Sequence, residues 1–203
     1  NLDEFFMVRV ASLRRKIDRG NNSHHSSGLT PKEILRETHG RVKELHKRVN
    51  FLLNEDINPQ LDKHGIRRVK WDSLSNEEKN QLTQKFKSDI LPILTPLAVD
   101  PAHPFPHISG LSLNLGVIVQ NPEREDEFFA RIKVPPTFSR FIPTSPSKPG
   151  RFIPLEEIIS QHLSKLFPGM KILDHYTFRL TRNQDLEFED EETEDLLSSL
   201  EQE

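Results

Sequence analysis

Residues 111–119 read LSLNLGVIV, and their hydrophobic pattern decides the fold of this chain. Leucine or valine occupies every second position from Leu111 to Val119, whereas polar residues such as Ser112 and Asn114 stand between them. A hydrophobic period of two is typical of a β-strand with one face against a core, because successive side chains point to opposite faces. We therefore expect a half-buried strand over this stretch.

The same period recurs in residues 128–134 (FFARIKV) and in residues 172–181 (ILDHYTFRLT). Asn121-Pro122 is a turn signal between the first two segments, so these two strands are expected to pair as a hairpin. The three segments together predict one sheet. The side chains expected to face its core are Leu113, Leu115, Val117, Phe128, Ile132, Tyr176 and Phe178.

The residues before the sheet predict helices. In residues 1–19 apolar side chains recur every three or four positions, and residues 20–28 (GNNSHHSSG) form a loop without an apolar side chain. Thr30-Pro31-Lys32-Glu33 is a capping box with proline in the first turn, which marks the start of a second helix. A heptad stripe of apolar residues follows, and Pro59 is expected to kink or end this helix. Residues 1–64 are therefore predicted to form a helical hairpin.

The second half combines helices with the predicted sheet. The capping box Ser75–Glu78 (SNEE) starts a helix, and the proline-rich stretch 94–106 is expected to be extended and irregular. A further helix is expected after Pro154, and the acidic segment 190–203 predicts a last one. An antiparallel sheet with helices on one face is the economical assembly, so residues 65–203 are expected to form an α+β domain.

Composition excludes several classes of protein. The sequence has no cysteine, which excludes disulfides and thiolate chemistry, and no apolar run of about 18 residues that could cross a membrane. A cytoplasmic location is expected, with peripheral membrane association as a second option. The charge is uneven, since residues 1–70 hold 15 Lys and Arg against 9 Asp and Glu, and residues 184–203 hold 10 Asp and Glu and no cation. Both ends read as cut, so we expect an excised piece of a longer protein.

Motifs for chemistry are few. The sequence has no Walker-type or dinucleotide-binding glycine loop and no zinc-binding helix motif, so no metal site is expected. Of the nine histidines, only His103 and His107 stand four apart in a structured context, and the prolines around them exclude a helix. The basic residues before position 70 are not interleaved with aromatic ones, so the stacking that binds single-stranded nucleic acid is not supported, and no nucleic acid is named as the expected partner.

Six blocks of the sequence resemble the long, ATP-dependent polyphosphate kinases, and they occur in that family's order along the whole chain. The first block, NLDEFFMVRV, resembles the family's Asn-Leu-Asp-Glu-Phe signature. The blocks are Asn1–Val10, Leu94–Pro106, Leu111–Leu115, Arg151–Glu156, Phe167–Met170 and Phe178–Asn183.

The resemblance implies an activity for the parent protein. The family reversibly transfers the γ-phosphate of ATP to inorganic polyphosphate through a phosphorylated histidine in C-terminal domains, which are expected to lie beyond this chain. No histidine here matches that motif, so the resemblance provides no catalytic residue. It does imply that Asn1 contributes to ATP binding, because the Asn of the signature does so in the family; a helix cap is the alternative role.

The resemblance also implies cofactors and partners. ATP or ADP, Mg²⁺ and polyphosphate would bind the intact enzyme, and none is expected on this chain alone. Residues 1–64 resemble the second part of the family's N-terminal helical domain, and residues 65–203 resemble its middle domain. The middle domain takes part in dimer contacts in the family, so a homo-oligomer is expected. Two other classes stay open, a non-enzymatic interaction module and a nucleic-acid binder argued from the basic first third.

Overall fold

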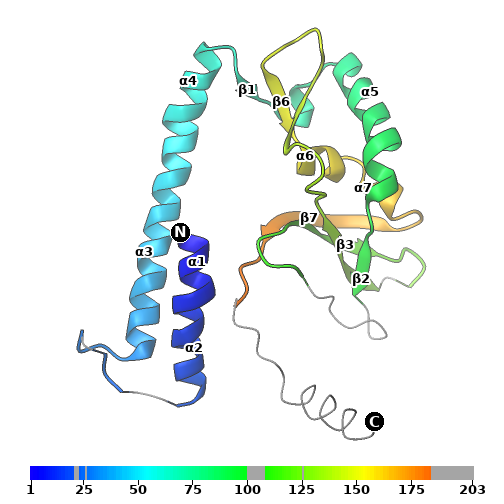
Figure 1. The fold of residues 1–203 in the computed structure, drawn as a ribbon. Coiled ribbons are helices and arrows are strands. Elements are labelled where there is room, and N and C mark those ends of the chain that lie inside the picture. Colours follow the sequence, from blue (N-terminus) through cyan, green and yellow to red (C-terminus); the bar gives the residue numbers. More distant parts are fainter. Residues whose placement is uncertain (21–22, 26, 100–107, 125, 184–203) are drawn as a thin grey trace, which may run out of the picture. The chain divides into compact units, whose positions relative to one another are not determined.

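The structure is a computed structural model that describes residues 1–20, 23–25, 27–99, 108–124 and 126–183. It divides into two compact units, Asn1–Val42 with Thr181–Glu203, and Lys43–Leu180. Its helices and mostly antiparallel sheets confirm the predicted α+β class. Figure 1 shows the elements of each unit.

The first unit is a helical hairpin. Its first helix is continuous through α1 (Leu2–Phe5), the π-helical η1 (Phe6–Val10) and α2 (Ala11–Asp18), and it ends before Gly20, whose φ is +69°. The second helix, α3 (Pro31–Leu52), packs against the first, since Val10 is 3% exposed and the ring of Phe6 stacks on His39 at 6.4 Å. The predicted hairpin is confirmed.

The capping box at the start of α3 is confirmed in atomic detail. The backbone nitrogen of Thr30 donates to Oε2 of Glu33 at 2.8 Å, and the backbone nitrogen of Glu33 donates to Oγ1 of Thr30 at 3.4 Å. Two backbone donors that the helix itself cannot pair are therefore satisfied by side chains.

The long helix does not stop at Pro59. It continues through η2 (Leu53–Ile57), which is π-helical, into α4 (Asn58–Lys63), and Gly65 follows with φ +75°. Proline lacks an N–H donor, so the hydrogen bond to the preceding turn is lost, and the wider π turn ends at Ile57, two residues before Pro59.

The second unit continues with a short strand and helical turns. Strand β1 (Arg67–Arg68) precedes the 3₁₀ turn η3 (Trp71–Ser73), helix α5 (Asn76–Lys85), the π-helical η4 (Phe86–Ile90) and the 3₁₀ turn η5 (Leu91–Ile93). The predicted capping box of α5 is present in both directions between Ser75 and Glu78.

The main sheet has four strands in the order β2-β4-β3-β7, and all its neighbours are antiparallel. The three predicted strands are confirmed as β3 (Leu113–Gln120), β4 (Glu127–Lys133) and β7 (Lys171–Arg179), whereas β2 (Leu97–Val99) lies in the stretch expected to be irregular. The expected hairpin of β3 and β4 is present, with Val117 opposite Ala130.

A second, small sheet has the order β1-β6-β5. Strand β6 (Arg151–Pro154) pairs in parallel with β1 and antiparallel with β5 (Phe141–Pro143). The expected helix after Pro154 forms two short pieces, α6 (Leu155–Ser160) and α7 (Leu163–Leu166).

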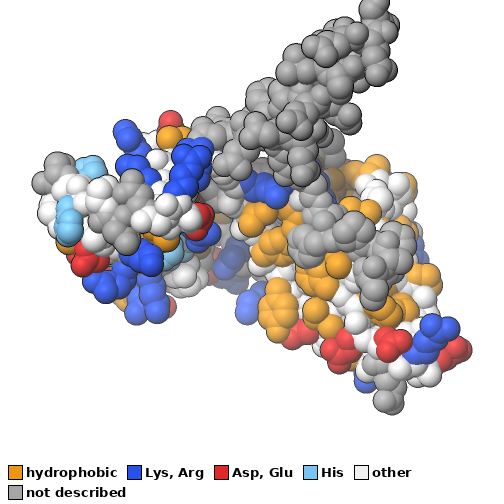
Figure 2. All heavy atoms as spheres, turned by 90° about the horizontal axis from the view of Figure 1, so that it is seen from below, with side chains coloured by type: hydrophobic (Ala, Val, Ile, Leu, Met, Phe, Trp, Pro, Cys, Tyr) orange, Lys and Arg blue, Asp and Glu red, His pale blue; other side chains and the backbone are white. Residues whose placement is uncertain are grey.

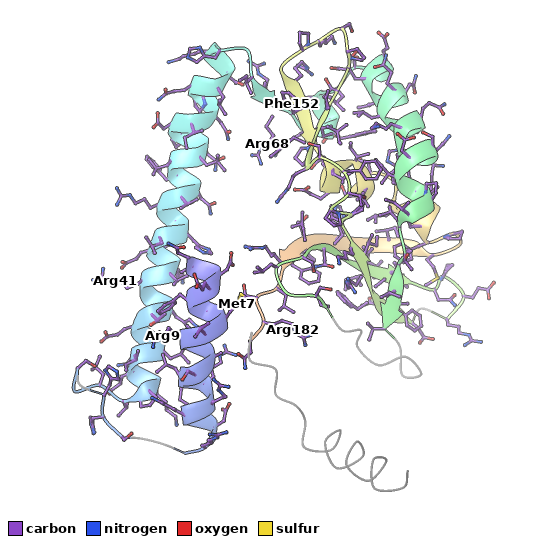
Figure 3. The ribbon with its side chains drawn as sticks, in the orientation of Figure 1. Met7, Arg9, Arg41, Arg68, Phe152 and Arg182 are labelled. Atoms are coloured by element: carbon purple, nitrogen blue, oxygen red, sulfur yellow. The ribbon has the colours of Figure 1, made fainter. Side chains whose placement is uncertain are left out.

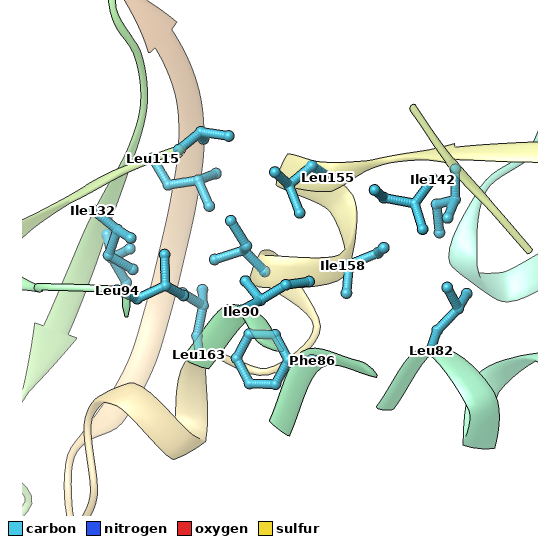
Figure 4. Packing of buried hydrophobic residues seen from close by; sticks show 14 of the residues in the cluster. Leu82, Phe86, Ile90, Leu94, Leu115, Ile132, Ile142, Leu155, Ile158 and Leu163 are labelled. Atoms are coloured by element: carbon cyan, nitrogen blue, oxygen red, sulfur yellow. The ribbon is translucent and has the colours of Figure 1, made fainter. Parts of the chain in front are cut away.

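One hydrophobic core joins the sheets and helices of the second unit. Figure 1 shows α5, α6 and α7 on the same side of β3 and β7, and Figure 4 shows side chains from these elements packed together. The most deeply buried members include Phe86, Ile90, Leu115, Ile132, Ile153, Leu155, Ile158 and Ile159. Burying hydrocarbon side chains of this size is the main source of stability for such a unit.

Two of the residues predicted to face the core do not. Tyr176 is 62% exposed and lies opposite Gly116, and Phe178 lies opposite the polar Asn114. Residues directly opposite each other in a sheet share a face, and Leu115 and Val117 define the core face. Tyr176 and Phe178 therefore lie on the other face of the sheet, called the outer face below.

The prediction failed because β7 is an edge strand whose more polar face lies on the helix side. The pairing of β3 with β7 also shifts register between Ile118 and Val119, which one period-2 pattern cannot reveal. The helix expected over 190–203, and His103 and His107, lie outside the described residues.

Candidate functional site

Asn1 precedes the first turn of α1. Its backbone oxygen accepts a hydrogen bond from the nitrogen of Phe5 at 2.9 Å, while its side chain is exposed and makes no capping hydrogen bond. The carboxamide is therefore not used as a helix cap, and its amide and carbonyl groups face solvent.

Several cations belong to the same unit as Asn1. Three of them, Arg15, Lys16 and Arg19, line a polar hollow with Ser12 at the C-terminal part of the first helix and its cap. Figure 3 labels Arg182, which follows Thr181; the hydroxyl of Thr181 donates to Oδ1 of Asp3 in α1 at 3.5 Å. The helical unit thus offers positive charge on the helix that Asn1 begins.

His162 is packed into the core of the second unit. It is 6% exposed, its Nδ1 lies 2.8 Å from the oxygen of Ile158, and its Nε2 lies 3.1 Å from Oγ1 of Thr83. The ring stacks on Phe86 with centroids 4.3 Å apart, and burial lowers its pKa. Within the described ranges, no group of three or more histidines and carboxylates could hold a metal ion.

A cavity of about 420 Å³ opens where β3 begins and β4 ends. One side is formed by residues 109–113 and the other by residues 133–136, and Phe138, Arg140 and Leu155 complete its lining. Pro135, Pro136 and Phe138 contribute mainly apolar surface, so charged groups at its edge lie in a medium less polar than water.

Leu111 holds one side of this cavity in a rare backbone conformation. Its φ is +60°, the only positive value among the described residues other than glycine, and such a conformation costs on the order of 1–3 kcal/mol. Two hydrogen bonds hold Leu111 in this conformation. Its backbone nitrogen donates to the oxygen of Leu180, which follows β7, at 2.7 Å, and its backbone oxygen accepts from Nε of Arg179 in β7 at 3.3 Å. Strain of this kind is concentrated at functional sites.

A chain of polar side chains leads from the sheet to the cavity. Nε of Arg131 in β4 donates to Oδ1 of Asn114 in β3 at 2.8 Å, and Nδ2 of Asn114 lies 3.0 Å from Oγ of Ser112. Arg131 is 6% exposed and Asn114 is fully buried, and Ser112 lines the cavity and donates to the oxygen of Ser109. The guanidinium and the cavity edge are therefore fixed relative to each other.

The charge of this site is positive. Lys133 lines the cavity and has an exposed side chain, and Arg140 beside it forms an ion pair with Glu156 at 2.7 Å. Such an arrangement favours an anionic ligand. The resemblance pointed to the block Leu111–Leu115, which forms one side of the cavity. The sequence gave no signal for Arg131, because its partner Asn114 lies 17 positions away in another strand.

A second surface of the second unit is an apolar groove of about 480 Å³. Leu53 and Leu61 contribute from the long helix, Ile66 from the loop that follows, and Phe141 and Phe152 from the small sheet. Figure 3 labels Phe152 and Arg68, which also lines this groove.

The chain matches family models along its length. The polyphosphate kinase N-terminal domain matches residues 1–69, and the polyphosphate kinase middle domain matches residues 77–203.

In the described part of the chain, no helix is both long and apolar enough to cross a membrane.

Known proteins show the same similarity. A polyphosphate kinase of Streptomyces coelicolor is 53% identical over 203 residues, which cover 100% of this chain and 27% of that protein. A polyphosphate kinase of Mycobacterium tuberculosis is 43% identical over 215 residues, covering 100% of the chain and 29% of the relative. The crystal structure of polyphosphate kinase from Porphyromonas gingivalis superposes with a TM-score of 0.78 at 26% identity, over 99% of this chain and 32% of that one.

Proposed function

The chain belongs to the polyphosphate kinase family, and we propose that it is the N-terminal helical and middle part of an enzyme that reversibly transfers the γ-phosphate of ATP to inorganic polyphosphate. The observation that carries the proposal is the match of the whole chain to relatives of that name. The chain spans only 27% of the first of these, and the phosphorylated histidine is proposed to lie in the remainder.

The proposed boundary between a helical domain (1–64) and the middle domain (65–203) is supported by the family matches, which leave only residues 70–76 unassigned. Gly65, with φ +75°, ends the long helix at this point. The contact-based division falls earlier, at Val42 and Lys43, within α3. The two divisions differ because the family matches compare sequences, whereas the compact units reflect contacts within the structure. Helix α3 is shared between the two compact units.

Asn1 is proposed to contribute to nucleotide binding in the intact enzyme. Its exposed carboxamide has no capping role, and an amide can both donate to and accept from a nucleotide. A single neutral contact contributes about 0.5–1.5 kcal/mol, far below the roughly 8 kcal/mol of a micromolar complex. ATP, ADP and Mg²⁺ are therefore proposed ligands of the intact enzyme and not of this chain by itself, in a cytoplasmic setting with peripheral membrane association as an option.

The activity test compares this chain with the same chain extended through the remaining length of its relatives. Each is incubated with ATP, Mg²⁺ and a polyphosphate primer, and polyphosphate is measured. We expect product only from the extended protein, in which Asn1→Ala should raise the KM for ATP about 2–10-fold, the effect of losing one hydrogen bond. Turnover or histidine phosphorylation in residues 1–203 alone would contradict the proposal.

Self-association is proposed as the role of the apolar surfaces. The stripe on α3 leaves Leu45 51% and Val49 59% exposed, and in the groove Ile66 and Phe141 are each nearly half exposed. Contiguous exposed apolar surface marks interaction sites, which also supports the alternative of a non-enzymatic interaction module. Sedimentation at high micromolar concentration should show a dimer that Val49→Ser weakens and His46→Ser, a change at an exposed polar site on the same helix, does not. Monomer throughout would exclude self-association.

A further inference from the structure

Arg131 is a buried cation whose hydrogen-bonding capacity is largely unused. It is 6% exposed, and the hydrogen bond from Nε to Asn114 is the contact that the described residues provide. The described residues provide no hydrogen-bond partner for its two Nη groups. A charged group in such a setting normally has a partner, because desolvating it without one is costly.

The surroundings of Arg131 on the outer face are apolar. Leu97 of β2 and Gly116 of β3 lie directly opposite Arg131 in the register of the sheet. A Cβ atom at Gly116 would lie 2.9 Å from the ring of Phe129 and 3.4 Å from that of Phe178, so both rings close over this glycine. Figure 2 shows hydrophobic side chains gathered over the sheet-bearing unit, and such a wall strengthens electrostatic attraction at the arginine.

Lys133 supplies a second positive charge on the same face. It is two residues beyond Arg131 on β4, opposite Asn114, and its exposed side chain has no ion-pair partner among the described residues. The paired parts of β2, β3 and β4 carry no acidic residue on this face, with Glu127 at the far end of β4 as the exception. Asp174 of β7 lies opposite Ile118, and its carboxylate accepts a hydrogen bond from the hydroxyl of Tyr176.

We infer that Arg131 and Lys133 form a binding subsite for a phosphoryl group at the edge of the cavity. The two free Nη groups of an arginine present a planar fork that matches two phosphate oxygens, and a neighbouring lysine suits the second charge of a phosphate better than it suits a monoanionic carboxylate. The bond to Asn114 fixes the plane of the guanidinium before the ligand arrives.

A phosphoryl group could come from inorganic polyphosphate or from a nucleotide. The geometry defines the phosphoryl group that polyphosphate and nucleotides share. We expect polyphosphate to be the ligand, and that expectation rests on the proposed function. The subsite itself stands on the two cations and their surroundings.

The experiment titrates the chain of residues 1–203 with sodium tripolyphosphate, ATP and succinate, and it follows the Nε–H signals of arginine by NMR together with the dissociation constant. We expect tripolyphosphate to shift the Arg131 signal, which Arg131→Lys identifies by its loss. Lys133→Ala should weaken binding about tenfold, as for the loss of a hydrogen bond to a charged group. Lys171→Ala is the matched control, since Lys171 is exposed on the same face but opposite Gln120, roughly 20 Å along the sheet.

The outcomes separate the alternatives. A stronger response to ATP than to tripolyphosphate would keep the subsite and assign it to nucleotide. An equal response to succinate, an unshifted Arg131 signal, or equal losses in the Lys133 and Lys171 variants would overturn it. The binding experiment needs no turnover, so its result is independent of the proposed enzymatic activity. Inactivity of the extended protein would not count against the subsite, and activity of the extended protein would not count in its favour.

Discussion

Oγ1 of Thr144 donates a hydrogen bond to Oε1 of Glu78 at 2.9 Å, joining the loop after β5 to the first turn of α5. The same carboxylate caps α5 through Ser75, and it lies 3.3 Å from Nε of Arg151 and 3.5 Å from Nζ of Lys148. Glu78 is 2% exposed, so one buried side chain links a helix start to the small sheet.

Replacing Glu78 should therefore destabilise the second unit. Glu78→Gln retains size but removes the charge that faces Arg151, and we expect a loss of about 1–3 kcal/mol in the free energy of unfolding. Glu77→Gln, at the exposed neighbouring position, is the control and should change stability by less than about 0.5 kcal/mol. Urea unfolding of both variants measures the difference, and equal midpoints would contradict this role of Glu78.

Stability should also depend on acid through Glu78. The pKa of Glu78 is lowered from 4.5 to about 2. The largest cause is the hydrogen bond from the backbone of Ser75, followed by those from the side chains of Thr144 and Ser75 and by the charge of Arg151. Burial opposes this shift and raises the pKa. A carboxyl whose pKa is lower in the folded state contributes stability above its unfolded pKa, and this is lost as the pH falls from about 4.5 towards 2.

The measurement is the unfolding free energy of the wild type and Glu78→Gln over that interval. The wild type should lose more stability than the variant, so their curves should converge on acidification. His162, whose pKa burial lowers, is present in both proteins, so its titration cancels in the comparison. Parallel curves between pH 4.5 and 3 would show that Glu78 does not titrate as described.

Gly150 is expected to tolerate no side chain. Its φ is +88°, and a Cβ atom there would lie 2.0 Å from the backbone oxygen of Gly65, next to the bond from the nitrogen of Arg67 to the oxygen of Gly150. Gly150→Ala should cost about 3 kcal/mol or more, because the backbone of β1 must move. Gly169→Ala is the matched control, since its φ is +77° but nothing lies within 4 Å of its Cβ, and about 1–2 kcal/mol is expected. Similar losses in both would exclude the clash.

Two phenylalanines should differ in their contribution to stability. Phe86 is fully buried and stacked on His162, so Phe86→Ala should cost about 3–5 kcal/mol. Phe178 is half-buried on the outer face, so Phe178→Ala should cost only about 1–2 kcal/mol. Chemical denaturation of the two variants gives the comparison, and an equal cost would mean that the outer face is as well packed as the core.

Local signals in the sequence predicted local structure well. The capping boxes at Thr30 and Ser75 identified two helix starts, because the residues that pair are three positions apart. The alternation in β3 and β4 likewise predicted their core faces. Strands β5 and β6 were missed because they are short and contain proline, and they exist only through pairing with distant segments.

The candidate site was predicted less completely. The role of Asn1 rests on resemblance and stays a prediction, since its position at the start of α1 neither requires nor excludes a nucleotide. The pair of Arg131 and Asn114 depends on strand register, which no single segment encodes. Each residue occupies a polar position of an alternating strand, and that pattern alone suggests solvent exposure and not burial.

The position of β7 has a consequence for colloidal behaviour. As the last strand of the order β2-β4-β3-β7, it leaves one row of backbone donors and acceptors without a strand partner among the described residues. Such rows recruit strands from other molecules and so seed aggregates. The charges of Lys171 and Asp174, the irregular register beside Ile118, and an opposite edge reduced to the short β2 all oppose this recruitment. These features oppose fibre growth from a sheet whose outer face exposes large side chains such as Leu97 and Tyr176.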